Sequence, residues 1–228
     1  MRQEDLKSLL VGSFLWSLLV ILWVLGLFWA PTDVYQGQVY RIIYLHVPAA
    51  AAAFSSAFLL FIVSCFNLKK PGEKWLNFGQ ASAEVGLLFT VLTLATGSIW
   101  GRPTWGTWWT WDARLTTTFV LFLLYAAYLL TLKSIEQGRT RQVAAAILGI
   151  VIFIDVPIIY KSVEWWRTLH QGHSIVREGG SAMSKEMLYL LLGCIAVNVG
   201  LIIWFSLFRA KNLNLKSDLE QKILGQQT

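Results

Sequence analysis

Residues 9–29 read LLVGSFLWSLLVILWVLGLFW and contain no charged side chain. A membrane-spanning helix needs about 20 consecutive, mostly apolar residues, because the hydrocarbon core of a bilayer is about 30 Å thick. No small-residue cleavage site follows this stretch, so a retained helix is favoured over a removed signal peptide. The sequence therefore predicts that the first helix of the chain lies in a membrane.

Further apolar blocks of similar length follow, and the chain is 56% hydrophobic but only 14% charged. A soluble domain carries about 25% charged residues, and its helices show apolar stripes rather than unbroken apolar blocks. We predict an all-α, polytopic transmembrane bundle of six helices that forms one integral membrane domain, 1–228. The predicted spans are 9–29, 47–67, 82–100, 115–132, 143–160 and 187–208.

The basic residues are unevenly divided between the two sides of this predicted bundle. Of the 19 Lys and Arg residues, twelve flank the spans on the side of the two termini and seven lie on the other side. The positive-inside rule then places both termini in the cytoplasm. The net charge of +6 comes from these short flanks, so we predict no nucleic-acid partner. Cys65 and Cys194 show neither CxxC nor zinc spacing, which favours a packing role.

The most specific feature of the sequence is segment 100–114, WGRPTWGTWWTWDAR, which we predict to be a loop on the outer face. An interfacial aromatic belt explains one or two tryptophans at a helix end, but not five of the twelve within this segment. If residues 105–112 are helical, one face carries Trp105, Trp108, Trp109 and Asp112. Such a face suits a large planar ligand with a charged rim, with an enlarged belt as the alternative.

All three histidines fall on the predicted outer side. His46 begins the second span, with Pro48 placed where a first-turn proline is tolerated. His170 and His173 lie in the loop before the sixth span. Neutral imidazole is a common ligand of haem iron, so His46 and His170 could hold an iron porphyrin from both sides. An ordinary interfacial role is the alternative for each histidine, and His173 ranks below His170.

A porphyrin held at this face would need cations for its propionates. Arg41 and Arg114 lie on the same predicted side, where they could make charge-assisted hydrogen bonds to carboxylates. Contact with lipid headgroups is the alternative role for both residues.

Two acidic residues fall within predicted spans, where a charge costs about 2.5–3.5 kcal/mol at the bilayer centre. Glu84 is close enough to the cytoplasmic end of its span to reach water. Asp155 precedes Pro157 in the outer half of the fifth span and could support a ligand pocket. The sequence shows no HExxH motif and no serine, histidine and acid constellation, so hydrolysis is not predicted.

The sequence also resembles a known family at these residues. Residues 105–116, WGTWWTWDARLT, look like the tryptophan-rich "WWD" signature of haem-handling proteins. Arg41 with YLHVP at 44–48, and SVEWW at 162–166 with His170, resemble the CcmC family of the system I cytochrome c maturation pathway. The likeness covers nearly the whole chain. The larger CcmF and system II relatives share the WWD block, but chain length and span number favour CcmC.

The resemblance implies a multi-pass protein of the bacterial inner membrane that holds haem b at the periplasmic face. It also implies delivery to the haem chaperone CcmE, with CcmA and CcmB (an ATP-binding-cassette complex) and the small CcmD as further partners. Such a protein is a binding and delivery platform rather than an enzyme, because covalent haem attachment occurs on CcmE. The residues that match the family pattern are His46 and His170 as axial ligands, Trp105, Trp109, Trp111 and Asp112 as the platform, and Arg41 and Arg114 at the rim.

Two other classes of function remain open from the residues. A bis-histidine cytochrome for electron transfer would prefer histidines inside the spans and a second pair of them. A transporter pore would call for internal repeats or several charges deep in the bilayer, and the sequence shows neither. Haem delivery therefore stands as the main prediction, with electron transfer as its alternative.

Overall fold

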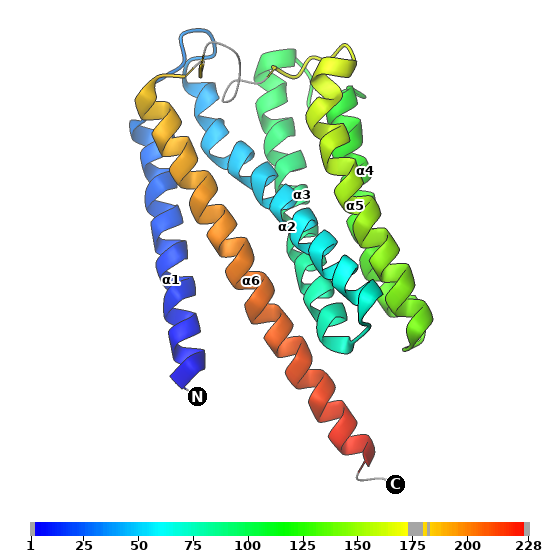
Figure 1. The fold of residues 1–228 in the computed structure, drawn as a ribbon. Coiled ribbons are helices and arrows are strands. Elements are labelled where there is room, and N and C mark those ends of the chain that lie inside the picture. The colour runs from blue at the N-terminus through cyan, green and yellow to red at the C-terminus, as the bar shows by residue number, and fades with distance from the viewer. Residues whose placement is uncertain (1–2, 173–179, 182, 226–228) are drawn as a thin grey trace.

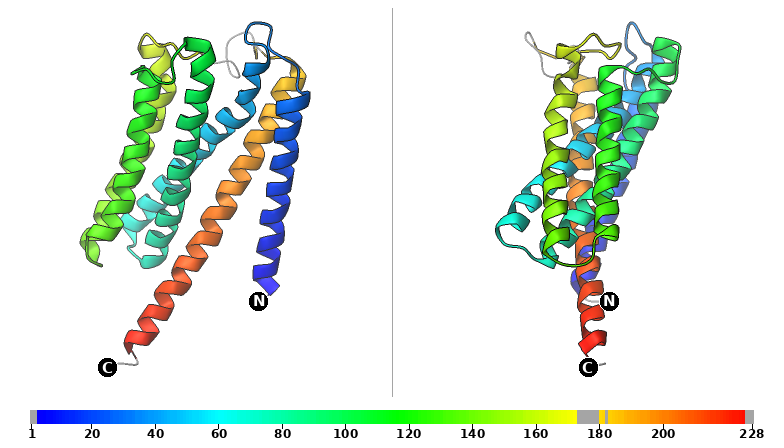
Figure 2. Two further views of the ribbon diagram at one scale, coloured as in Figure 1. Left: turned by 180° about the vertical axis from the view of Figure 1, so that it is seen from behind. Right: turned by 90° about the vertical axis from the view of Figure 1, so that its right-hand side faces the viewer.

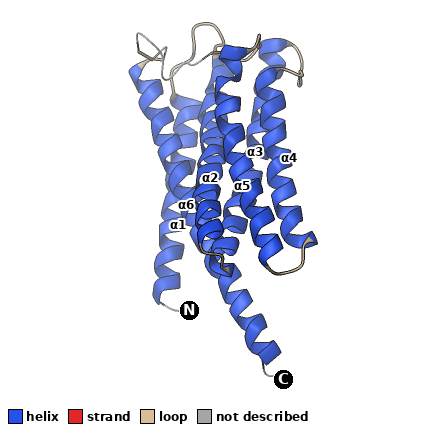
Figure 3. Ribbon diagram, turned by 45° about the vertical axis from the view of Figure 1, so that its right-hand side comes forward, coloured by secondary structure: helices blue, strands red, loops and turns tan. Residues whose placement is uncertain are grey.

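The computed structural model describes residues 3–172, 180–181 and 183–225, so His173 lies outside the described residues. These residues contain six long helices and no strand, which confirms the predicted all-α bundle (Figures 1 and 3). The helices are α1 (Gln3–Val24), α2 (Ile43–Lys69), α3 (Glu73–Trp105), α4 (Ala113–Ser134), α5 (Arg139–Trp165) and α6 (Lys185–Gly225).

Each of these helices is long and apolar enough to cross a membrane, α1 together with the π-helical turn η1 (Leu25–Trp29) that follows it. α2 to α6 extend beyond both ends of the predicted spans, whereas α1 with η1 begins before residue 9 and ends at the predicted residue 29. α6 shows the largest difference, because it continues to Gly225 rather than ending at residue 208. A span predicted from hydropathy ends at the first polar residues. The helix itself can continue further, as long as its polar residues find water or a partner. Lys211 of α6, for example, pairs with Asp5 of α1 over 2.6 Å.

The order of the helices in space differs from their order in the chain (Figures 1 and 2). α2 packs against α3, α5 and α6, and so lies in the middle of the bundle. α1 packs on α6 at one side, and α4 packs on α5 at the other. The start of α1 and the end of α6 lie at the same end, here called the termini end, and the opposite end is called the cavity end.

Tyr125 joins three helices in the bundle interior. It is fully buried on α4, and its hydroxyl donates to the carbonyl oxygen of Ala53 on α2 over 2.9 Å. Gly86 of α3 lies against the ring, and any side chain at this position would overlap it. A buried hydroxyl without a partner is costly, so this bond and the close approach together fix α4 against α2 and α3.

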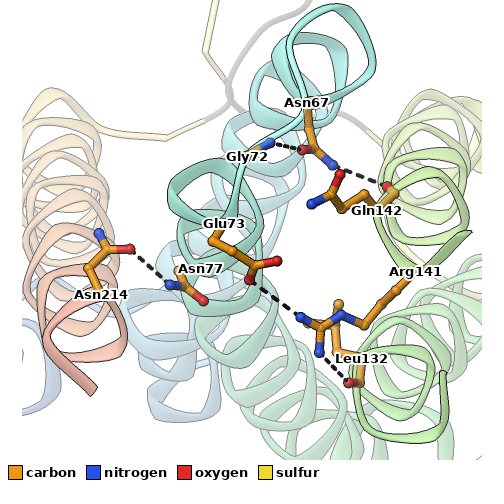
Figure 4. Close-up of polar contacts among 8 residues, drawn as sticks. All are labelled: Asn67, Gly72, Glu73, Asn77, Leu132, Arg141, Gln142 and Asn214. Carbon is orange, nitrogen blue, oxygen red and sulfur yellow. Dashed lines mark hydrogen bonds and ion pairs between the residues drawn. The ribbon is translucent and has the colours of Figure 1, made fainter. Parts of the chain in front are cut away.

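Polar contacts fix the helices at the termini end (Figure 4). They join the turn between α2 and α3 to the beginning of α5, and the lower part of α6 to α3. The contacts are Asn67 with Gln142 (3.1 Å) and Gly72 (3.3 Å), Arg141 with Glu73 (3.3 Å), and Asn77 with Asn214 (2.9 Å).

The two acidic residues predicted within spans differ in their surroundings. Glu84 lies well inside α3, and both of its carboxylate oxygens accept hydrogen bonds from Arg209 of α6, at 2.7 and 3.1 Å. Asp155 of α5 is buried, and its Oδ2 atom has no hydrogen-bond partner among the described residues. Glu84 is thus part of the contacts between α3 and α6.

Candidate functional site

A cavity of about 820 Å³ opens at the cavity end of the bundle. Its volume lies within the range of about 300–1,000 Å³ that is typical of small-molecule and cofactor pockets. Helices α2, α3, α4 and α5 and the segment after α5 contribute to its wall. The lining residues include His46, Val47, Phe54, Gly97, Trp100, Trp105, Trp109, Arg114, Leu115, Ile159, Leu169 and His170.

The cavity brings together the two histidines that the sequence predicts as ligands. The ring centroids of His46, on α2, and His170, after α5, lie 6.5 Å apart, with an angle of 37° between the ring planes. A metal–imidazole bond is about 2.0–2.1 Å long, which places the centroids of two rings on opposite sides of one metal roughly 6 Å apart. The spacing therefore fits a single metal between the two imidazoles.

The partner of His46 determines which ring nitrogen carries the proton. Its Nδ1 atom lies 3.1 Å from the hydroxyl oxygen of Thr96, and that hydroxyl donates its own proton to the carbonyl of Leu92 over 2.7 Å. The hydroxyl oxygen therefore accepts from the Nδ1–H group of His46. In a neutral imidazole the lone pair then lies on Nε2, which makes Nε2 the ligand atom.

His170 shows the same arrangement with a different partner. Its Nδ1 atom lies 2.9 Å from the carbonyl oxygen of Gln171, which can only accept a hydrogen bond. The Arg114 guanidinium is 3.5 Å from the same nitrogen, a longer contact with a group that can only donate. The carbonyl therefore decides the tautomer, and the Nε2 atom of His170 carries the lone pair.

Two indole rings lie beside the histidines. The Trp105 ring centroid is 6.3 Å from that of His170, and the Trp100 ring packs edge-on against His46 at 5.7 Å. The Nε1–H group of Trp100 donates to Gln36 over 2.7 Å. The sequence prediction missed Trp100 and Thr96 as site residues. Thr96 and Trp100 lie nine and five residues before Trp105, so helical spacing does not place them on its face, and their position beside His46 depends on how α3 packs against α2.

Residues 106–112 are not helical, so the condition under which Trp105, Trp108, Trp109 and Asp112 would share one helical face is not met. α3 continues through Trp105 and ends there, so the non-helical segment is 106–112 rather than the predicted 100–114. Gly106 has a φ of 79°, in the left-handed region that favours glycine, and its N–H group donates to the carbonyl of Arg102 over 3.1 Å. The helix therefore stops in the middle of the tryptophan cluster.

The indoles of this segment consequently point in different directions. Trp109 lines the cavity, whereas Trp108 is 58% exposed and Trp111 is 74% exposed. Trp111 packs edge-on against Trp109, with ring centroids 5.5 Å apart. Of the three indoles predicted as the platform, Trp105 and Trp109 face the cavity, and Trp111 backs Trp109 from outside.

Asp112 is buried, although it does not line the cavity. Its Oδ1 atom accepts from the backbone N–H of Arg114 over 2.9 Å and so caps the N-terminus of α4. Its Oδ2 atom accepts from the backbone N–H of Leu169 over 2.8 Å. Asp112 thus joins the first turn of α4 to the segment that carries His170.

The two predicted arginines have different surroundings. Arg114 lines the cavity and donates to the carbonyl of Tyr160 over 2.9 Å, while its buried Nε atom has no hydrogen-bond partner among the described residues. Arg41 is outside the cavity wall, and its guanidinium donates to the carbonyl oxygens of Leu27 and Ala30 at 2.5–3.0 Å. Arg114 is therefore placed to meet an anion in the cavity, and Arg41 fixes the end of the first span.

The surroundings of His46 also differ from the prediction. A turn of 3₁₀ helix, η2 (Gln38–Ile42), leads directly into α2, so Pro48 lies in the second turn of α2 rather than the first. Gly97 of α3 faces the imidazole, and a Cβ atom at this position would lie 3.1 Å from Cε1 of His46. The close approach of α3 therefore leaves little freedom for the His46 ring.

Comparison with known proteins identifies relatives over most of the chain. The family model "CcmC: Heme exporter protein C" matches residues 4–224. "Heme exporter protein C" of Haemophilus influenzae is 40% identical over 205 residues, which cover 88% of this chain and 81% of the relative. The protein of the same name from Escherichia coli K12 is 39% identical over 203 residues, 86% of this chain and 79% of the relative.

A plant protein is similar to the same degree. The "putative cytochrome c biosynthesis ccmC-like mitochondrial protein" of Marchantia polymorpha is 40% identical over 188 residues, which cover 81% of this chain and 78% of the relative. Both the family model and these relatives span far more than half of the sequence. The chain belongs to the CcmC family.

Proposed function

We propose that this protein holds haem b (iron protoporphyrin IX) at the outer face of the bacterial inner membrane and delivers it to the haem chaperone CcmE for cytochrome c maturation. The observation that carries the proposal is the pair of imidazoles, 6.5 Å apart between their centroids, in the cavity wall. The name of the two bacterial relatives, heme exporter protein C, supports the same cargo.

The chemistry of the site fits an iron porphyrin better than a bare metal ion. Among the described residues, no group of three or more His, Cys, Asp or Glu side chains is arranged to hold a metal. Two imidazoles alone suit a metal that brings its other four ligands in a plane, as haem iron does. The guanidinium of Arg114, which lines the cavity, is an additional donor for a carboxylate of the ligand.

The residues have separate proposed roles. The Nε2 atoms of His46 and His170 bind the iron axially, and Arg114 binds a propionate. Trp105 and Trp109, with Trp100, form the wall for the flat face of the porphyrin. Trp111 supports Trp109 from outside, and Arg41 contributes to the rim by holding the end of the first span.

This arrangement favours a platform over a turnover enzyme. When both axial positions of the iron are occupied by imidazoles, no open position is left for oxygen chemistry. The reactive groups then belong to the haem, and the protein contributes binding, orientation and exclusion of water. We infer that covalent attachment of the haem takes place on the chaperone.

The proposal includes an orientation and a set of partners. The twelve Lys and Arg residues that flank the spans on the termini side favour a cytoplasmic location for both termini. The cavity then faces the periplasm, where the chaperone receives haem. CcmA, CcmB and CcmD are proposed as partners in the membrane.

Delivery can be tested by co-expressing the protein with CcmE and measuring the intact mass of the purified chaperone. We expect a haem adduct on CcmE that is absent with the His46→Ala and His170→Ala double variant. Asn77→Ala, at the opposite end of the bundle, serves as the control and retains the adduct. Haem that cycles reversibly between oxidation states, without any adduct on CcmE, would instead support an electron-transfer cytochrome.

A further inference from the structure

Asp112 connects two parts of the chain that are far apart in sequence. One carboxylate oxygen caps α4, at 2.9 Å from the backbone nitrogen of Arg114. The other accepts from the backbone nitrogen of Leu169, at 2.8 Å. Asp112 is only 9% exposed, so both hydrogen bonds are largely shielded from water. Hydrogen bonds to an ionised acceptor are roughly twice as strong as those between neutral groups.

The segment that donates this hydrogen bond, through the N–H group of Leu169, also carries the neighbouring residue His170. The last hydrogen bond of α5 is donated by the N–H group of Trp166 to the carbonyl of Ser162, and residues 167–172 are not helical. Besides the bond to Asp112, the backbone N–H of His170 donates to Thr168 within the same segment over 3.0 Å. Asp112 therefore ties this backbone to the first turn of α4, where the Arg114 side chain also contacts the His170 ring at 3.5 Å.

We propose that Asp112 is a positioning residue that holds the His170 imidazole in its ligating place, rather than a residue that contacts haem. This inference rests on the proposed function, because it assumes that His170 binds the iron. Asp112, the acidic residue of the tryptophan-rich signature, would then act on the backbone beside the ligand His170. Trp109 contacts the cargo, and Asp112 acts through Leu169.

The two tasks of Asp112 can be separated by substitution. Asp112→Ser and Asp112→Asn both leave a good N-cap for α4, because Ser, Asn and Asp are similarly effective there. Ser cannot reach both backbone N–H groups, and Asn has one acceptor oxygen for the two of them. Both variants should therefore keep the N-terminus of α4 capped and lose the hydrogen bond from the N–H group of Leu169. Leu169→Pro removes the same hydrogen bond from the other partner.

A matched control is available at Asp33. Its Oδ1 atom also accepts from two backbone N–H groups in an outer loop, those of Tyr35 (2.9 Å) and Gln36 (2.8 Å). Asp33→Ser thus removes a carboxylate from a different loop, which borders the cavity on the side of Trp100 and His46 and does not lie in the segment of His170. We expect this variant to keep the haem spectrum of the unmodified protein.

The experiment measures two properties of each variant purified as the full chain. In the haem-loaded protein, the Asp112 variants should retain haem roughly 10- to 100-fold less well, the usual effect of removing an outer partner of a metal ligand. Their absorption spectra should change from six-coordinate low-spin to five-coordinate high-spin, and added imidazole should restore the low-spin form. In haem-free protein, hydrogen exchange of residues 166–172 should become faster.

The possible results distinguish the inference from the proposed function. A low-spin spectrum and unchanged haem retention in both Asp112 variants and in Leu169→Pro would overturn the positioning role alone. An unmodified protein without bis-histidine haem would overturn the proposed function and this inference together. If the Asp112 variants do not fold, the same readouts on Leu169→Pro decide the question.

Discussion

The two ends of the bundle use their polar residues in opposite ways. At the termini end, charged and amide side chains on different helices meet each other, as Arg141 does with Glu73 and Asn77 does with Asn214. At the cavity end, Asp112, Arg41 and Arg114 are held by backbone groups. Arg141 and Arg114 each keep a buried Nε atom without a hydrogen-bond partner among the described residues, but of the two only Arg114 lines the 820 Å³ cavity, as His46 and His170 also do.

This difference separates structural polar residues from functional ones. Side chains that satisfy each other contribute to the packing of helices and have little left to offer a ligand. Side chains that are held by the backbone and directed into a cavity are fixed before the ligand arrives, so less ordering is needed on binding. Substitutions at the two ends should therefore affect different measurements.

The largest expected effect on haem binding comes from the ligands themselves. His46→Ala or His170→Ala removes one of the two proposed ligands, and we expect haem retention to fall by about 100-fold or more, beyond the roughly 10- to 100-fold cost of removing an outer partner of a ligand. Haem content after purification measures this loss directly. If both variants contain as much haem as the unmodified protein, the claim that the cavity end binds haem and the termini end does not is contradicted.

A smaller effect is expected at Thr96, which accepts the Nδ1–H hydrogen bond of His46. Thr96→Val keeps the shape and removes the acceptor, so haem retention should fall by about tenfold or somewhat more. Thr96→Ser keeps the hydroxyl and is the control. Haem transfer to an excess of apomyoglobin gives the dissociation rate, and the same rate in the Val and Ser variants would show that Thr96 does not orient the ligand.

Substitution of the tryptophans should reduce haem retention less than Thr96→Val does. Trp105 lines the cavity beside His170, whereas Trp111 is 74% exposed. Aromatic contacts contribute about 0.5–1.5 kcal/mol beyond burial, so Trp105→Ala should weaken haem retention by about 2- to 10-fold. Trp111→Ala should change it less. An equal or larger loss at Trp111 would mean that haem binds against the outer side of the segment.

The smallest effect on haem is expected at the termini end. Arg141→Ala removes the ion pair with Glu73, whose side chain is 34% exposed. We expect a loss of about 1 kcal/mol in the free energy of unfolding, within the range of partly exposed pairs. Denaturation in detergent by increasing SDS measures this change, and Arg141→Lys is the control. The haem spectrum should be unaltered, and a spectral change would show that the two ends are coupled.

Much of the fold could be predicted from the sequence, because a helix in lipid requires a long unbroken run of apolar residues, which is easily recognised. The ends of the helices could not be predicted in this way. α6 continues to Gly225 because residues such as Lys211 find partners on other helices, and hydropathy does not contain this information. The start of α2 was also placed too late. The 3₁₀ turn η2 brings the chain into helical geometry before His46, so Pro48 lies in the second turn of α2.

The site was predicted in part. His46 and His170 could be found because histidine is rare in this chain and both lie at one predicted face. The turn at Gly106 broke the expected helical face, so Trp111 and Asp112 were assigned to a surface they do not form. Thr96 and Trp100 were missed because their roles depend on how α3 packs against α2, which no local pattern records.

The central claim is that both imidazoles bind one iron, and electron paramagnetic resonance of the purified ferric protein tests it most directly. Two axial imidazoles make ferric haem low-spin, so the unmodified protein should give a low-spin signal that His46→Ala and His170→Ala each convert to high-spin. A high-spin signal in the unmodified protein, or a low-spin signal that survives both substitutions, would contradict the account.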